Sequence, residues 1–170
     1  MAEPLIRIED LCVDFPVDKK HVLHAVNHVS LSIDKGETVG LVGESGCGKT
    51  TLGRAVKGIY PATSGRIFYK GKNLTEMTQQ EKFDYTREGQ MIFQDPYSSL
   101  DPRMTVREII KEGMKAHKMG TAQEMNQKVY EMLETVGLSA EHANRFPHEF
   151  SGGQRPVSYT HLTLPTKRIV

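Results

Sequence analysis

Several features that would assign a protein class at once are scarce or absent in this chain of 170 residues. Lys plus Arg total 22 and Asp plus Glu total 21, so the net charge of +1 gives no general attraction to nucleic acid or to an anionic membrane. No apolar run approaches the roughly 18 residues of a membrane-spanning helix, and the first residues show no signal-peptide pattern. The two cysteines, Cys12 and Cys47, form no CxxC pair, which favours a reduced, cytosolic setting.

The overall amino-acid composition is that of a soluble globular domain. Hydrophobic residues make up 38% of the chain and charged residues 25%, which excludes a disordered or membrane class. The length suffices for one domain with a core and is too short for two full enzyme domains. Any anion-binding site in a chain of nearly neutral charge must therefore be local.

Hydrophobic patterning predicts a strand-rich first part and a helical second part. Alternation and short apolar runs predict strands over residues 5–15, 29–33, 39–42, 67–69 and 91–93. The run at 39–42 is continuous, as in a strand buried on both faces. Helices are expected over 50–57, 75–85, 106–114 and 125–136, with Thr105 as a cap and apolar stripes that form core in the last two.

A glycine-rich segment follows the expected buried strand and precedes a helix. Residues 43–50, Gly43-Glu44-Ser45-Gly46-Cys47-Gly48-Lys49-Thr50, match GxxxxGK[ST]. Glycines let the backbone N–H groups wrap closely around phosphate oxygens, and a helix N-terminus favours an anion. Lys49 can reach the β and γ phosphates and the Thr50 hydroxyl can ligate Mg²⁺. The alternative is a plain glycine turn.

The pattern indicates a nucleoside triphosphate with Mg²⁺ but does not choose between kinase, GTPase and motor ATPase. The guanine-specific NKxD motif is absent from the sequence. We count Thr51, the next residue of the helix, in the same nucleotide-binding set. Cys47 is interpreted as a small residue that the loop tolerates, with a redox role as the alternative. The histidines show no HExxH or cysteine-paired spacing that would predict a metal site.

A second glycine motif lies about a hundred residues further on. Ser151-Gly152-Gly153-Gln154 can cap a helix and expose backbone N–H groups as a second anion cradle, although alone it could be a Ser-Gly turn. Together with residues 43–50 it resembles the signature motif of the ATP-binding subunits of ABC transporters. The resemblance extends from about Ile6 to Arg155.

The resemblance implies an α/β fold: a P-loop NTPase core of the ABC ATPase type, with an antiparallel β subdomain and a helical subdomain. Gln94 stands at the family's Q-loop glutamine, which senses Mg²⁺ and the attacking water. Phe15 resembles the aromatic residue that stacks on adenine, a buried strand aromatic being the alternative. The implied domains are 1–92 for the nucleotide-binding core and 93–155 for the Q-loop and helical subdomain.

Within this family, the motifs of the chain most resemble those of the oligopeptide and dipeptide importer branch. Residues 43–49, 93–102 and 147–154 carry this likeness. It implies a pair of ATP-binding subunits, identical or different, with each ATP between one subunit's phosphate loop and the other's signature motif. It further implies two transmembrane permease subunits, a separate peptide-binding protein, no nucleic acid, and a peripheral position at the cytoplasmic face of the membrane.

The resemblance stops after Arg155. The family continues with a helix and a strand ending in Asp-Glu, whereas residues 156–170 contain no acidic residue and begin with Pro156, which would break the helix. We therefore expect a fold incomplete at its C-terminus, and hypothesise that 156–170 are a read-through, frameshift or cloning join. His161 does not match the family's switch histidine. The alternatives to a peptide-importer ATPase are a nucleotide-binding remnant without turnover and an ABC ATPase for another substrate, such as DNA or ribosomes.

Overall fold

The computed structural model describes residues 3–94 and 100–150. The chain divides into two compact units, Met1–Gly89 and Gln90–Val170, and each is described by itself. The expected tail at 156–170 and the motif Ser151–Gln154 lie outside the described residues.

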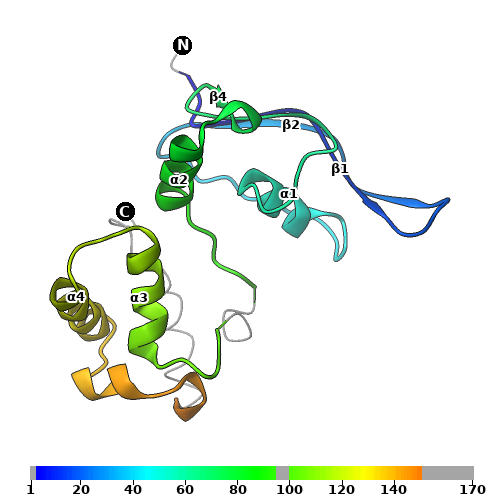
Figure 1. Ribbon diagram of the computed structural model, residues 1–170. Helices are drawn as coiled ribbons and strands as arrows, with labels where there is room; N and C mark the ends of the chain where they lie inside the picture. The colour runs from blue at the N-terminus through cyan, green and yellow to red at the C-terminus, as the bar shows by residue number, and fades with distance from the viewer. Residues whose placement is uncertain (1–2, 95–99, 151–170) are drawn as a thin grey trace. The chain divides into compact units, whose positions relative to one another are not determined.

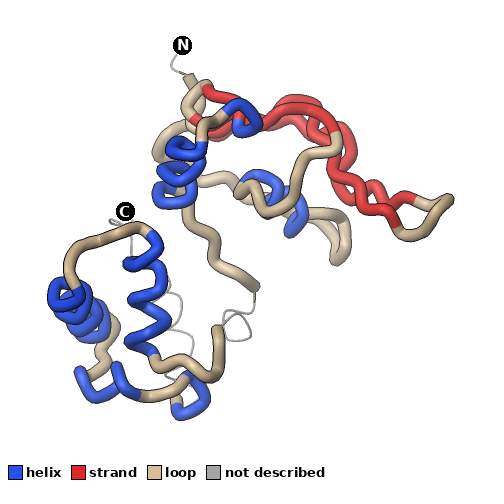
Figure 2. The backbone as a smooth tube through the Cα atoms, viewed as in Figure 1, coloured by secondary structure: helices blue, strands red, loops and turns tan. Residues whose placement is uncertain are grey.

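The first unit is built on an antiparallel sheet of four strands in the order β2-β1-β3-β4. Figures 1 and 2 show its two long strands, β1 and β2, running side by side. The strands are β1 (Ile6–Pro16), β2 (Val22–Ile33), β3 (Ser64–Tyr69) and β4 (Lys72–Asn73). The two long strands form a hairpin whose register shifts near Asp10, where the backbone is left-handed with φ of 49°. Ordinary residues adopt this conformation mainly at bulges and turns.

One helix packs its apolar side against this sheet and forms the core of the first unit. Helix α1 (Lys49–Val56) buries Leu52 and Ala55 among apolar strand residues. The buried members of this core are Ile8, Leu11, Val13, Val26, Leu52, Ala55 and Ile67. The contact holds α1 against strands β1 and β2.

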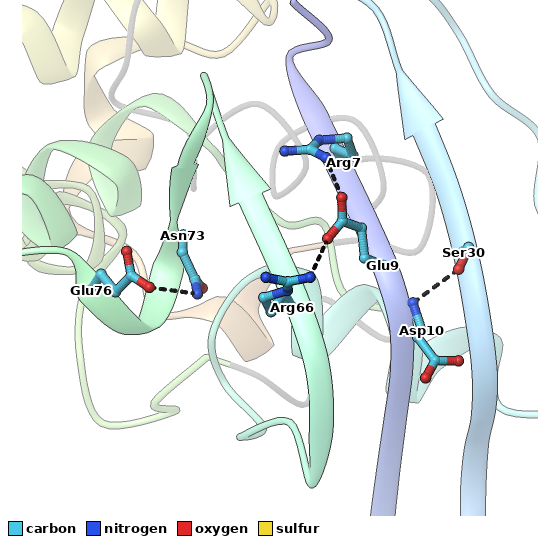
Figure 3. A network of polar contacts seen from close by, with 7 residues as sticks. All are labelled: Arg7, Glu9, Asp10, Ser30, Arg66, Asn73 and Glu76. Atoms are coloured by element: carbon cyan, nitrogen blue, oxygen red, sulfur yellow. Dashed lines mark hydrogen bonds and ion pairs between the residues drawn. The ribbon is translucent and has the colours of Figure 1, made fainter.

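Polar side chains tie neighbouring strands together at the surface of the sheet (Figure 3). Glu9 of β1 pairs with Arg7 on its own strand and with Arg66 of β3, at 3.1 Å for the latter. The backbone N–H of Asp10 donates to the Ser30 hydroxyl on β2 at 2.9 Å. Such exposed ion pairs contribute about 0–1 kcal/mol each, so the apolar contacts beneath them supply most of the stability.

The first unit ends with a short 3₁₀ helix, η1 (Leu74–Glu76), and helix α2 (Gln79–Glu88). A single helix was expected over 75–85, and its start was wrong because Thr78 caps α2: its hydroxyl accepts from the Glu81 N–H while the Glu81 carboxylate accepts from the Thr78 N–H. The chain therefore changes direction before α2 begins.

The second unit is helical, as expected. Its elements are α3 (Val106–Ala116), α4 (Ala122–Thr135), η2 (Ala140–Asn144) and η3 (Pro147–Glu149). Thr105 caps α3 as predicted, and Thr121 caps α4 in the same way. The predicted apolar stripes do form the core, whose buried residues are Val106, Ile110, Met114, Met125, Val129, Leu133, Leu138, Ala143 and Phe150.

Two expected strands are not formed. Residues 39–42 and 91–93 have no strand structure, and apart from half-buried Met91 their apolar side chains are exposed, to 94% at Val42 and 53% at Ile92. A strand buried on both faces needs hydrogen-bonded neighbours. Within 3–94 and 100–150 the only strands are the four of the antiparallel sheet, and none of them pairs with either segment.

Candidate phosphate-binding site

The glycine-rich segment forms a loop that runs directly into α1. Gly46 and Gly48 both have left-handed backbones, with φ of 83° and 93°, and Gly48 is the N-cap of the helix. L-residues with a side chain reach this conformation only at a cost of about 1–2 kcal/mol, which explains two glycines in three positions. The first backbone N–H groups of α1 have no acceptor within the helix, and no acidic residue lies in its first turn.

Gly48 is also fixed by its contact with strand β2. A Cβ atom at this position would lie 2.1 Å from the carbonyl oxygen of Ala25. Only a glycine permits this approach, and it holds the start of α1 against the strand. A Cβ at Gly43 would lie 2.7 Å from the Cys47 sulfur, a side-chain atom that can rotate, so Gly43 is less restricted than Gly48.

The Lys49 ammonium lies within the loop. Its Nζ donates to the carbonyl oxygens of Gly43 at 2.8 Å and Glu44 at 2.6 Å, and lies 3.4 Å from Cys47 Sγ. The positive charge is thereby held beside the N-terminus of α1. Both the ammonium and the helix terminus favour an anion at the same place.

The remaining loop residues differ in their exposure. Glu44, Ser45, Gly46, Cys47 and Thr50 are exposed, and Gly48, Lys49 and Thr51 are half-buried. The Thr50 hydroxyl stands in the first turn of α1, next to Lys49. A hydroxyl oxygen in this place suits a hard cation such as Mg²⁺ held together with phosphate oxygens. The residues present therefore fit a Mg²⁺-nucleotide.

A cavity of about 330 Å³ lies between the loop and strand β2. Its lining includes His24, Ala25 and Asn27 of β2 with Cys47 and Lys49 of the loop. His24 bonds through Nδ1 to Asp14 of β1 at 2.9 Å. The β2 residues were not predicted from the sequence, because their place beside the loop depends on the pairing of distant segments and has no local pattern.

Phe15 lies on β1 and is half-buried against the first core. Its ring meets Tyr60 edge-on, with centroids 5.1 Å apart. The lining of the cavity beside the loop does not include Phe15. Adenine stacking by Phe15 stays a prediction. In the structure, the Phe15 ring packs against Tyr60.

Gln94 belongs to the second unit, and the phosphate loop to the first. Gln94 is exposed in a segment without strand or helix structure. The motif Ser151–Gln154 follows Phe150, which is buried in the core of the second unit at 1% exposure. Within the described residues, no group of three or more His, Cys, Asp or Glu side chains could hold a metal ion, and no helix is long and apolar enough to span a bilayer.

Fold and loop together define a P-loop nucleotide-binding protein. The sequence profile of the ABC transporter family matches residues 26–158, and the chain belongs to this family. It is 52% identical over 157 residues to the oligopeptide transport ATP-binding protein OppF of Bacillus subtilis, and 47% identical over 160 residues to the dipeptide transport ATP-binding protein DppF of Lactococcus lactis. Both alignments cover 91% of this chain and 51% of the relative, so the chain spans about half the length of these relatives.

A solved structure confirms the fold class. The dimeric post-hydrolysis structure of the ATP-binding cassette MJ0796 bound to ADP and Pi has a TM-score of 0.78 at 22% identity, and the match covers 94% of this chain and 68% of that one. The predicted ABC ATPase architecture is thus correct, although residues 39–42 and 91–93 are not strands here.

Proposed function

We propose that this chain binds ATP with Mg²⁺ at the phosphate loop and serves as an ATP-binding subunit of a peptide importer. The single observation that carries the proposal is the loop itself: two left-handed glycines and the Lys49 ammonium at the N-terminus of α1. These groups combine backbone donors, a fixed positive charge and a helix terminus at one place. That combination suits phosphate and little else.

The chain's own residues have distinct roles in this proposal. The backbone N–H groups of residues 43–51 surround the phosphates, and Lys49 exchanges its bonds to two loop carbonyls for bonds to the β and γ phosphates. The Thr50 hydroxyl holds Mg²⁺, which neutralises developing charge when it is bound. By the family resemblance, Gln94 orients the attacking water, Phe15 stacks on adenine, and Ser151–Gln154 bind the nucleotide of a partner subunit.

Transport of peptides is proposed from the relatives. OppF and DppF are named for oligopeptide and dipeptide transport, and 52% and 47% identity supports the same substrate class here. The partners are then a second ATP-binding subunit, two permease subunits at the cytoplasmic face of the membrane and, indirectly, a peptide-binding protein. Complementation of a bacterium that lacks its own oligopeptide ATP-binding subunit, with sensitivity to a toxic tripeptide as the readout, tests this part.

Nucleotide binding is tested with a fluorescent ATP analogue on the wild type and two lysine variants. Lys49→Ala removes a cation that makes charge-assisted hydrogen bonds, so binding should weaken by roughly tenfold or more. Lys35→Ala is the matched control, because Lys35 is exposed in a turn before the loop. Equal affinity of the Lys49→Ala variant and the wild type would contradict the proposal.

A second candidate is ATP binding without turnover by this chain alone. It is favoured by one observation: residues 156–170 contain no Asp or Glu, the residue types that would polarise the attacking water there. A phosphate-release assay on the chain, run beside the binding assay, separates the two candidates. Release that depends on Lys49 would exclude the second one.

A further inference from the structure

A second cavity, of about 390 Å³, lies in the first unit away from the phosphate loop. It is formed by the C-terminal end of α1 and the segment that follows, by β3 and β4, and by α2. All of its lining residues fall within 55–86, so it contains none of residues 43–51. Its volume is within the usual range for small-molecule sites.

The charged residues that line this cavity are all basic. Its lining includes two lysines, Lys57 and Lys82, and none of the lining residues, all of which are described, is Asp or Glu. Arg66 also borders the cavity, but it pairs with Glu9 on the face of the sheet opposite to Ile67, so its guanidinium is directed away from the cavity. An anion of low charge would therefore meet the two lysines and no carboxylate of the lining.

Lys57 is the less hydrated of the two lysines, because it is half-buried whereas Lys82 is exposed. Its ammonium donates to the Gly89 carbonyl at 2.5 Å and lies 4.4 Å from the centroid of the Tyr85 ring, so its partners among the described residues are neutral. Burial lowers the pKa of Lys57 below its ordinary value. A desolvated cation with neutral partners gains from an anionic one.

The other walls are apolar and aromatic. Met77 and Tyr85 are buried, and Tyr60, Ile67 and Leu74 complete this side of the lining. The Tyr85 hydroxyl is already bonded to the Val56 carbonyl, which leaves the ring face as its contribution to the cavity. Aromatic rings and a methionine sulfur together favour a flat, polarizable group.

We propose that this cavity is a second ligand site, which takes a small aromatic carboxylate. The ring of the ligand packs against the aromatic and apolar walls, and its carboxylate is bound by the two lysines. The site does not depend on nucleotide, and the proposal does not rest on peptide transport.

The test uses the full chain labelled with ¹³C at the methionine methyl groups. Met77 is the only methionine within residues 3–89, and the described methionines of the second unit serve as references for folding. Titration with 4-fluorobenzoate at constant ionic strength should shift the Met77 resonance saturably, with a dissociation constant of about 1 mM or tighter. The neutral analogue 4-fluorobenzyl alcohol should bind at least about tenfold more weakly.

Variants separate this site from general anion binding. Lys82→Ala should weaken binding about threefold or more, whereas Arg66→Ala, whose side chain is on the other face of the sheet, and Lys128→Ala, an exposed position on α4, should not. Lys49→Ala should leave the affinity at Met77 unchanged. An unmoved Met77 resonance, equal binding of the alcohol, wild-type affinity in Lys82→Ala, or a loss in Arg66→Ala or Lys49→Ala would each overturn the proposal.

Discussion

Replacing Gly48 by alanine tests how strand β2 holds the phosphate loop. The new Cβ would lie 2.1 Å from the Ala25 carbonyl oxygen, on a backbone with φ of 93°. Gly46 offers a matched comparison within the same loop. Its φ of 83° is nearly the same, but a Cβ there would meet nothing within 4 Å. The two substitutions therefore share the backbone strain, and only Gly48→Ala adds a steric overlap with the Ala25 carbonyl oxygen.

The magnitudes follow from these two terms. A left-handed alanine costs about 1–2 kcal/mol at either position. At Gly48 the overlap with a backbone carbonyl cannot relax through a side chain, so α1 or β2 must shift and loosen the packing of Leu52 and Ala55. Overpacking of this kind costs about 1–3 kcal/mol more. We expect Gly48→Ala to lower the free energy of unfolding by about 2–5 kcal/mol, and Gly46→Ala by about 1–2 kcal/mol.

Urea denaturation monitored through the ¹³C-methyl resonance of Met77 measures the stability of the first unit separately from the second. Gly58→Ala is the control outside the loop, since its φ is 71° and a Cβ there meets nothing within 4 Å. Gly58→Ala and Gly46→Ala should destabilise alike. Equal destabilisation by Gly48→Ala and Gly46→Ala would refute the inference that contact with Ala25 positions the loop.

Three further predictions concern the helical core, acid stability and the thiols. Leu133→Ala removes a fully buried side chain of the second core and should lower the free energy of unfolding by about 2–5 kcal/mol in urea denaturation. The hydrogen bond from Lys72, together with those from the α2 cap, lowers the pKa of Glu81 to about 2. This contribution to stability is complete above the ordinary value near 4.5 and is lost as the pH falls toward about 2, so circular dichroism should show an acid loss of helix that is smaller in Glu81→Gln. N-ethylmaleimide should modify exposed Cys47 much faster than buried Cys12, and ATP should slow the reaction at Cys47; equal rates by mass spectrometry would contradict this exposure.

The phosphate loop could be predicted from sequence because all of its chemistry is local. Eight consecutive residues supply the glycines, the lysine and the threonine, and the helix that follows them starts at Lys49. The contact between Gly48 and Ala25 could not be predicted. It joins residues far apart in the chain, and it depends on the register of a hairpin that contains several shifts.

Strand β2 was predicted only in part, because polar residues interrupt its apolar alternation. Alternation indicated only 29–33, yet the strand starts at Val22. His24 and His28 interrupt the apolar pattern, and both bond to aspartates of β1, at 2.9 Å to Asp14 and 2.8 Å to Asp10. Cross-strand partners, which a single strand's sequence does not reveal, therefore extend the hairpin beyond its apolar part.

At residues 39–42 the error is the opposite one: the apolar run predicted a strand, but no neighbouring strand pairs with it. Composition sets a preference for burial, but a strand also needs hydrogen-bond partners from other segments. Val39, Leu41 and Val42 stay exposed, and none of the described strands pairs with them. The lining of the second cavity likewise depends on contacts between separate segments of the chain. Lys57 and Lys82 look like unrelated surface charges in the sequence, and only the packing of α1, β3 and α2 places them around one space that no Asp or Glu lines. Local patterns thus predict what a segment can do, whereas pairing between segments decides which sites exist.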